Sequence, residues 1–420
     1  MYLYLLPLIL VFGARLFFFR GRFSPFRKYG DFILLLYLFP LGFAIFYAKA
    51  VEATSSQGPS FSALLYLSLA LIIYFSPLFF HQSRKEVKIN LIDKNIVLFL
   101  CVVLVFGGFY SIIVFFPKAS FALRFGAEDL RALTNSGDYS VLSGSIKDTI
   151  AVGFSVFFGL SQLLAFLILA TKIFGAWSNF CAFSLIFSSS SYIFNSLAFA
   201  GRDGVVFWLF SFAFCYVFVR RWVDLKLPKL FWLVLVIFCV LGGGAFILIT
   251  IDRFNEVFFI FAYGAQQVHQ FNAQYVIDPP LYHGWNGFRE ILSLLGVGGE
   301  IDRDYHWQYY LNRDVNPWTF KFFIGSIFRD FGKVGTMLFL MVTSLLMWLM
   351  LIKKYSQDSV SRITSFGQIL AIYLYSQVGF MGVFYFKHSA LNLYLVVFFL
   401  LIFGFGLLRI FGLRWFVYFR

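Results

Sequence analysis

The chain has 420 residues, of which 60% are hydrophobic, and it combines a mean hydropathy of +0.82 with a formal net charge of +14. A soluble domain of this size cannot bury so much apolar side chain, which excludes a soluble globular protein. The apolar runs are continuous rather than alternating, which favours helices over a transmembrane β-barrel. The predicted fold class is therefore an all-α polytopic membrane protein.

Apolar stretches of the length that a transmembrane helix requires follow one another along the whole chain. We predict about eleven spans, which form a single membrane domain over residues 1–420. The spans fall near 2–19, 31–49, 62–80, 96–116, 149–171, 177–199, 204–219, 230–250, 334–352, 364–386 and 391–412. The stretch 318–331 is too short and too charged to span alone, and it is predicted to form an amphipathic or re-entrant helix that leads into the next span.

Lysine and arginine residues in the connections between spans predict the orientation of the chain. With the N-terminus outside, nearly the whole net charge of +14 falls on the cytoplasmic connections, which is the distribution that membrane proteins show. Basic residues arranged in this way anchor the topology, so no nucleic-acid partner is expected. The outer side then carries a loop at 117–148 and a large loop at 251–333, which ends in the amphipathic or re-entrant helix.

The segment 251–317 is polar and rich in aromatic residues, although the rest of the chain consists mainly of apolar runs. Its side chains that could bind an anion are Arg253, His283, Arg289, Arg303, His306 and Arg313, and its tyrosines and tryptophans include Tyr282, Trp285, Tyr305, Trp307, Tyr309 and Tyr310. Flat aromatic rings stack on sugar rings, but tryptophan and tyrosine also form the belts at membrane interfaces, which accounts for some of them. Such a segment favours a protein that handles a large polar substrate at the membrane surface.

Two short motifs at the outer ends of spans place an arginine beside glycines. In the G-R-D-G motif at 201–204, Arg202 either pairs with Asp203 to cap a hairpin or reaches a phosphate. In the F-R-D-F-G motif at 328–332, Asp330 is a candidate N-cap for the following span. The guanidinium of Arg329 offers the paired donors that suit phosphate oxygens.

Further candidate residues lie in the two outer loops. Arg124 and Arg131 would share one face if the loop 117–148 forms a helix, although a solvated surface helix explains this spacing equally simply. A histidine or carboxylate could take a proton from an attacking sugar hydroxyl, and the candidates are His283, Glu290 and His306. For each single histidine a structural role is the alternative.

Sequence motifs for cofactors and metal ions are absent. No Walker, GxSxG or HExxH motif occurs, and the four cysteines lie within apolar spans without the spacing of a metal site. The first outer loop contains only Glu52, so it lacks the pair of aspartates with which many lipid-phosphate glycosyltransferases hold a metal. We therefore expect no cofactor and no metal. If the chain transfers sugars, cationic side chains would offset the charge of a diphosphate.

These features together resemble a bacterial O-antigen polymerase, the Wzy type of oligosaccharide repeat-unit polymerase. The resemblance covers the span count, the large outer loop in the second half of the chain, and G-R-D-G at a span start. It also covers N-P-W-T-F at 316–320 followed by D-F-G-K-V-G at 330–335, because the family often shows N-x-x-T-F before D-F-G-x-x-G. One R-x10-G spacing, from Arg253 to Gly264, fits the family, whereas Arg289 does not have it.

The resemblance implies a membrane glycosyltransferase of the GT-C type that acts in lipopolysaccharide biosynthesis. It would lie in the bacterial inner (cytoplasmic) membrane as a multi-pass protein whose active site faces the periplasm. It would transfer the growing polysaccharide from undecaprenyl pyrophosphate to an incoming undecaprenyl-pyrophosphate-linked repeat unit. Membrane lipids and a chain-length-determining co-polymerase would be further partners.

This chemistry assigns roles to the candidate residues. The pyrophosphate-binding residues would be Arg202, Arg253, Arg289 and Arg329, and the sugar-binding residues would be Arg131, Tyr282, Trp285 and Trp307. O-antigen ligase, which uses the same donor, is one alternative. A lipid-linked oligosaccharide flippase or other transporter is another, although transporters tend to carry ionisable residues at mid-membrane, and the predicted spans are nearly free of charge.

Overall fold

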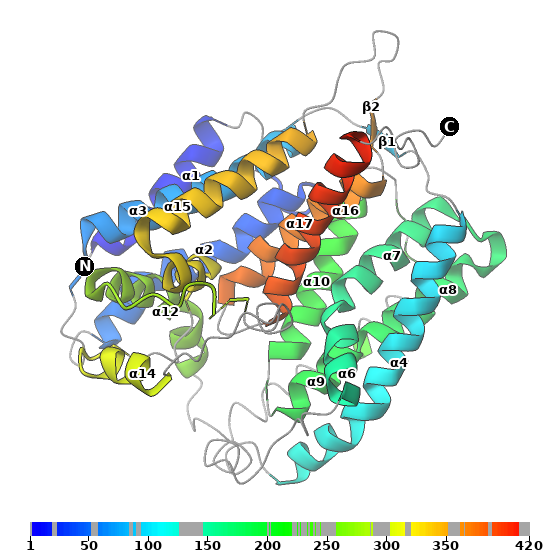
Figure 1. The fold of residues 1–420 in the computed structure, drawn as a ribbon, viewed down its shortest axis with the longest axis horizontal. Helices are drawn as coiled ribbons and strands as arrows, with labels where there is room; N and C mark the ends of the chain where they lie inside the picture. The colour runs from blue at the N-terminus through cyan, green and yellow to red at the C-terminus, as the bar shows by residue number, and fades with distance from the viewer. Residues whose placement is uncertain are drawn as a thin grey trace. The chain divides into compact units, whose positions relative to one another are not determined.

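A computed structural model shows that the chain is built almost entirely from helices (Figure 1). It describes residues 2–18, 23–51, 58–83, 87–89, 94–125, 146–199, 201, 203–220, 258–285, 287–288, 303–315, 321–351, 362–364, 366–384 and 389–410, with isolated residues between 225 and 244. Two short strands, β1 (Val87–Ile89) and β2 (Arg362–Thr364), pair with each other. The predicted all-helical class is confirmed.

The chain divides into two compact units. The first unit is formed by Met1–Lys88 together with Phe258–Tyr418, and the second unit by Ile89–Val257. The described residues to which the sequence assigned a catalytic, pyrophosphate-binding or sugar-binding role all belong to the first unit.

The second unit is a set of closely packed apolar helices. Its elements are α4 (Lys94–Phe125), α6 (Ile146–Val156), α7 (Phe158–Thr171), η2 (Gly175–Trp177), α8 (Ser178–Ser189), α9 (Ser191–Ala198) and α10 (Asp203–Arg220). In the G-R-D-G motif, the N–H of Gly204 donates to Ser196 Oγ at 3.0 Å, and a Cβ at Gly204 would lie 2.4 Å from the Cβ of Ser196. The glycine therefore permits the close packing of α10 on α9, whereas Arg202 lies outside the described residues.

The first unit packs helices from both ends of the chain. Its elements are η1 (Tyr2–Leu5), α1 (Leu6–Phe17), α2 (Tyr29–Val51), α3 (Phe61–Ser83), α12 (Phe258–Ile277), α14 (Arg303–Leu311), α15 (Phe323–Leu351), α16 (Phe366–Met381), η3 (Gly382–Phe384) and α17 (Ser389–Ile410). The rings of Tyr74 and Tyr375 stack at 4.4 Å, and each hydroxyl donates to the backbone oxygen of the other residue at 2.7 Å. These reciprocal bonds join α3 to α16 in the core because both phenols satisfy their polar atoms there.

Several helices are suited to crossing a membrane. Among the described residues, five helices are long and apolar enough, or six if α6 and α7, which meet at an angle of 45°, form one span. Large apolar side chains such as Phe99 and Phe106 on α4, and Leu338 and Leu345 on α15, are exposed, as expected for helix faces in contact with lipid. The chain is therefore a multi-pass membrane protein by the length and composition of its helices.

The number of such helices is smaller than the eleven spans predicted from the sequence. The apolar stretches predicted at 2–19, 204–219 and 391–412 form helices in which the described apolar part, Tyr2–Phe17, Gly204–Arg220 or Leu393–Gly404, is shorter than a typical span. The span predicted near 230–250 falls mainly on residues that the structure does not describe.

One end of the first unit is fixed by a buried ion pair. Arg15 Nε lies 2.6 Å from Asp31 Oδ1, and its Nη2 donates to Asp31 Oδ2 at 3.0 Å, with both side chains almost fully buried. The N–H of Ser24 also donates to Asp31, and the hydroxyl of Tyr29 lies 2.6 Å from His81 Nδ1. Buried charges require such matched partners, so these residues serve the packing of α1, α2 and α3.

Candidate functional site

The region predicted to be a large outer loop contains a helix that is packed into the first unit. Helix α12 lies along α2 and carries an unusual number of buried polar side chains, namely Gln266, Gln267, His269, Gln270, Asn272 and Gln274. An unpaired polar group is costly to bury, and hydrogen bonds to other segments match Asn272 and Gln274, whereas Gln266 Nε2 has no hydrogen-bond partner among the described residues. These side chains are therefore the polar part of an otherwise apolar bundle.

The polar side chains of α12 tie together segments that are far apart in the sequence. The side chain of Asn272 accepts a hydrogen bond from the N–H of Ser60 at 2.8 Å and donates to the oxygen of Gly58 at 3.0 Å. Gln274 Nε2 donates to the backbone oxygen of Gly325 at 2.8 Å, which fixes the first turns of α15. These polar contacts therefore attach the connection between α2 and α3, and the start of α15, to α12.

His269 occupies an aromatic site on the same helix. Its ring lies 5.8 Å from the ring of Tyr4 and 5.6 Å from that of Tyr47. Burial lowers the pKa of His269, so its imidazole is neutral at physiological pH. This histidine packs the N-terminal residues against α12 and α2.

Helix α15 is broken at Gly332, where φ is +66° and ψ is −167°. This backbone conformation is accessible essentially only to glycine, and it separates the segment Phe323–Phe331 from the apolar helix that follows. The segment is buried except at its last residue, Phe331. It corresponds to the amphipathic or re-entrant helix predicted at 318–331, and Asp330 lies in its last turn with a buried side chain.

A neighbouring segment supplies the backbone bonds that the break removes. The N–H groups of Tyr282 and His283 donate to the oxygens of Arg329 and Asp330 at 2.9 and 3.0 Å. Carbonyls in the last turn of a helix have no donor within the helix, so these two bonds satisfy them. The residues around Tyr282 are therefore fixed against the break in α15.

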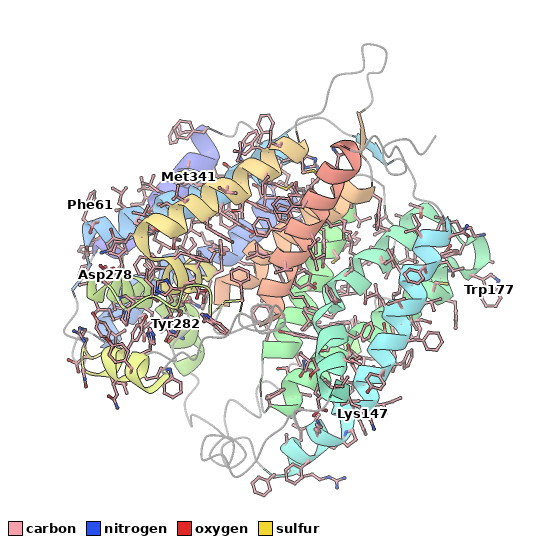
Figure 2. All side chains as sticks on the ribbon, viewed as in Figure 1. Phe61, Lys147, Trp177, Asp278, Tyr282 and Met341 are labelled. Atoms are coloured by element: carbon pink, nitrogen blue, oxygen red, sulfur yellow. The ribbon has the colours of Figure 1, made fainter. Side chains whose placement is uncertain are left out.

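The break places Arg329 among aromatic rings from α14 and from the segment around Tyr282. Only 5% of Arg329 is exposed, and its guanidinium carbon lies 4.5 Å from the centroid of the Tyr310 ring. Tyr282 stacks on His306 with ring centroids 4.0 Å apart. We call Tyr282, His306, Tyr310, Arg329 and Lys333 the Arg329 cluster; Figure 2 labels Tyr282 within it.

The phenols of the Arg329 cluster are neutral. Burial raises the pKa of Tyr310 to about 12, although the nearby charge of Arg329 acts in the opposite direction. Burial likewise raises the pKa of Tyr282, again against the effect of Arg329. Neither phenol ionises near pH 7, so the rings next to the Arg329 guanidinium are uncharged. A cation held in this way is suited to an anionic ligand.

A second cation follows the break. Lys333 Nζ lies 3.2 Å from Asp278 Oδ2 and 4.7 Å from the ring centroid of Tyr275, while the backbone oxygen of Lys333 accepts the hydroxyl of Tyr66 at 2.6 Å. Before the break, the buried side chain of Lys321 lies against Gly325, where a Cβ would be 3.0 Å from its carbons. Basic residues thus lie at both ends of the segment that carries Arg329.

Sequence reasoning did not identify Lys321, Lys333 or Asp278 as site residues. A signal for Lys321 is present, since Lys321, Gly325 and Arg329 recur every four residues, which is the spacing of one helix face. Lys333 continues this spacing in the sequence but lies beyond the break at Gly332. No comparable signal identifies Asp278, because its contact with Lys333 depends on the break at Gly332.

The structure brings three of the predicted site residues together, namely Arg329, Tyr282 and His306. His283 is exposed with φ of +51°, Trp285 is half-buried on the same turn, and Trp307 is half-buried on α14. The other predicted site residues, which are Arg131, Arg202, Arg253, Arg289 and Glu290, lie outside the described residues. Within the described ranges, no group of three or more histidine, cysteine, aspartate or glutamate side chains is placed to hold a metal ion.

Comparison of the chain with protein-family models, with curated proteins and with solved structures finds no match. The function is therefore inferred from the chemistry of the Arg329 cluster and from its place in a multi-pass membrane protein.

Proposed function

We propose that the chain is a polysaccharide polymerase of the Wzy type, a membrane glycosyltransferase that uses lipid-linked oligosaccharides as both donor and acceptor. The observation that carries the proposal is the buried guanidinium of Arg329, which lies over the Tyr310 ring at the break between a short buried helix and an apolar span. A lipid diphosphate has an apolar chain that belongs in the bilayer and a headgroup that requires cations. The Arg329 cluster offers the cations next to the apolar helix.

The chemistry of the transfer follows from these residues. Bond formation joins an acceptor hydroxyl to the anomeric carbon of the donor sugar, and the bond from that carbon to the diphosphate breaks. Negative charge then grows on the departing diphosphate, where fixed cations stabilise it. Arg329 and Lys333 supply positive charge. The half-buried side chains of Trp285 and Trp307 offer aromatic faces for a sugar.

The proposal also covers the fold type, the membrane, the orientation and the substrates that the sequence predicts. The protein would have the GT-C type of fold with about eleven spans, lie in the bacterial inner membrane with the Arg329 cluster facing the periplasm, and act in lipopolysaccharide biosynthesis with a chain-length-determining co-polymerase. The substrates would be undecaprenyl-pyrophosphate-linked repeat units.

A flippase for the same lipid-linked oligosaccharides is a second candidate function. Two observations favour it, namely the row of buried polar side chains on α12 and the broken helix α15. Transporters commonly use interrupted helices and polar side chains to form a site for a polar substrate within the membrane. A flippase and a polymerase would therefore need a similar binding site, and they would differ in what happens to the bound substrate.

Deletion of the gene from the bacterium that carries it separates these functions, and the readout is the surface lipopolysaccharide together with the pool of lipid-linked units. Loss of a polymerase leaves lipopolysaccharide with a single repeat unit, and this is the result that we expect. Loss of a ligase would leave no attached unit, and loss of a flippase would leave lipid-linked units on the cytoplasmic side. Either of these two outcomes, or an unchanged distribution of chain lengths, contradicts the polymerase.

A further inference from the structure

Left-handed backbone conformations gather beside the Arg329 cluster. Asp278 has φ of +47°, His283 has φ of +51°, and Gly332 has φ of +66°. The ion pair between Asp278 and Lys333 and the bond from His283 to Asp330 bring them to one place. A residue other than glycine is strained in such a conformation and persists there where the surrounding structure determines it, often at functional sites.

Asp278 is the residue among these that can take part in chemistry. Its side chain is 62% exposed, whereas the side chain of Asp330, which follows Arg329 in the chain, is buried. Its position is fixed on both sides, because the hydroxyl of Tyr309 donates to the backbone oxygen of Ile277 at 2.9 Å and Lys333 Nζ lies 3.2 Å from its carboxylate. The structure therefore presents an accessible carboxylate in a defined orientation beside the cations.

The residues around Asp278 connect it to the Arg329 cluster. Tyr282, four residues further along, donates its N–H to Arg329 and stacks on His306. Lys333, four residues after Arg329, pairs with Asp278. The Asp278 carboxylate therefore pairs with the first cation after the break that ends the Arg329 segment, and Figure 2 labels Asp278 and Tyr282.

We propose that Asp278 is the general base that removes the proton from the acceptor hydroxyl, with Lys333 as the residue that positions it. This inference rests on the proposed function. The acceptor oxygen bonds to the anomeric carbon, its proton passes to the Asp278 carboxylate, and the electron pair of the broken bond leaves on the diphosphate. The two predicted histidines are placed less well for this step, since His306 is buried against Tyr282 and His283 contributes its backbone N–H to the break.

The test uses the purified full-length protein in nanodiscs, with lipid-linked repeat units extracted from the deletion strain as substrate. Asp278→Asn removes the basic oxygen and keeps the backbone conformation, because asparagine tolerates the left-handed region. A positioned general base contributes about 10²–10⁴ to the rate, so kcat is expected to fall by that factor while KM is little changed. Asp314→Asn is the matched control, since Asp314 is also exposed and has φ of +55°, and it is expected to leave kcat unchanged.

A second variant distinguishes a base from a structural residue. Asp278→Gly keeps the left-handed conformation and leaves room for a small carboxylate, so added formate is expected to restore part of the lost rate. A wild-type kcat in Asp278→Asn, an equal loss in Asp314→Asn, or no response of Asp278→Gly to formate would each overturn the role of Asp278. None of these results affects the proposed polymerase, which the deletion phenotype tests separately.

Discussion

Replacement of Arg329 with alanine is expected to reduce the rate of polymerisation by about 10²–10³, the usual cost of losing one group that stabilises developing charge. The guanidinium is buried and lies over the Tyr310 ring, so alanine removes a positive charge from a site that is largely shielded from water. Complementation of the deletion strain with the variant should therefore leave lipopolysaccharide with a single repeat unit. The rate itself is measured with extracted lipid-linked units.

Two further variants show whether this effect is specific. Arg329→Lys keeps a positive charge but loses the planar, paired donors, so an intermediate rate is expected. Arg313→Ala is the control, because Arg313 is an exposed arginine whose guanidinium carbon lies 3.7 Å over the ring of Tyr309 outside the Arg329 cluster. Full-length polysaccharide from Arg329→Ala, at a normal level of protein in the membrane, would remove Arg329 from the site.

Replacement of Gly332 with alanine is expected to have the second largest effect. Its φ of +66° and ψ of −167° suit glycine, so alanine would lower the free energy of unfolding by roughly 1–3 kcal/mol. A Cβ there would also lie 3.2 Å from Leu281 Cδ2, next to the segment that binds Arg329 and Asp330. Because a shift of about 1 Å in a binding group can cost about 10²-fold in rate, activity should fall with stability.

The control for Gly332 is Gly42 in α2 of the same unit, where a Cβ would have no neighbour within 4 Å. Gly42→Ala should leave thermal unfolding in detergent and polysaccharide chain length unchanged. Equal unfolding temperatures for Gly332→Ala and the wild type would show that the break in α15 tolerates a side chain, and the account of the Arg329 cluster would then lose its structural basis.

The apolar helices were predictable because their signal is local. The predicted spans at 31–49 and 62–80 correspond to α2 and α3, and the amphipathic helix before a further span corresponds to the first part of α15. The sequence also singles out Arg329, because it precedes Gly332 by three residues at a span boundary, and its role in a site stays a prediction. In each case neighbouring residues determine the structure.

Other features depend on contacts between distant segments. Helix α12 was not predicted, because its polar residues favoured a loop. In the structure, the side chains of Asn272 and Gln274 form hydrogen bonds with distant segments, namely with Gly58, Ser60 and Gly325. The pairing of Asp278 with Lys333 joins the residue after α12 to the part of α15 beyond the break, whose conformation the sequence does not specify. Tertiary partners rather than local pattern stabilise these features.

Binding of a lipid diphosphate to the Arg329 cluster is the central claim, and it can be measured directly with the full-length protein in nanodiscs. The measurement compares the affinity for undecaprenyl diphosphate of the wild type and of Arg329→Ala, with undecaprenyl monophosphate as the second ligand. We predict that the wild type prefers the diphosphate and that the variant binds it about 10–100-fold more weakly, as expected for the loss of hydrogen bonds from a charged group. Equal affinity of the two proteins for the diphosphate would contradict the claim.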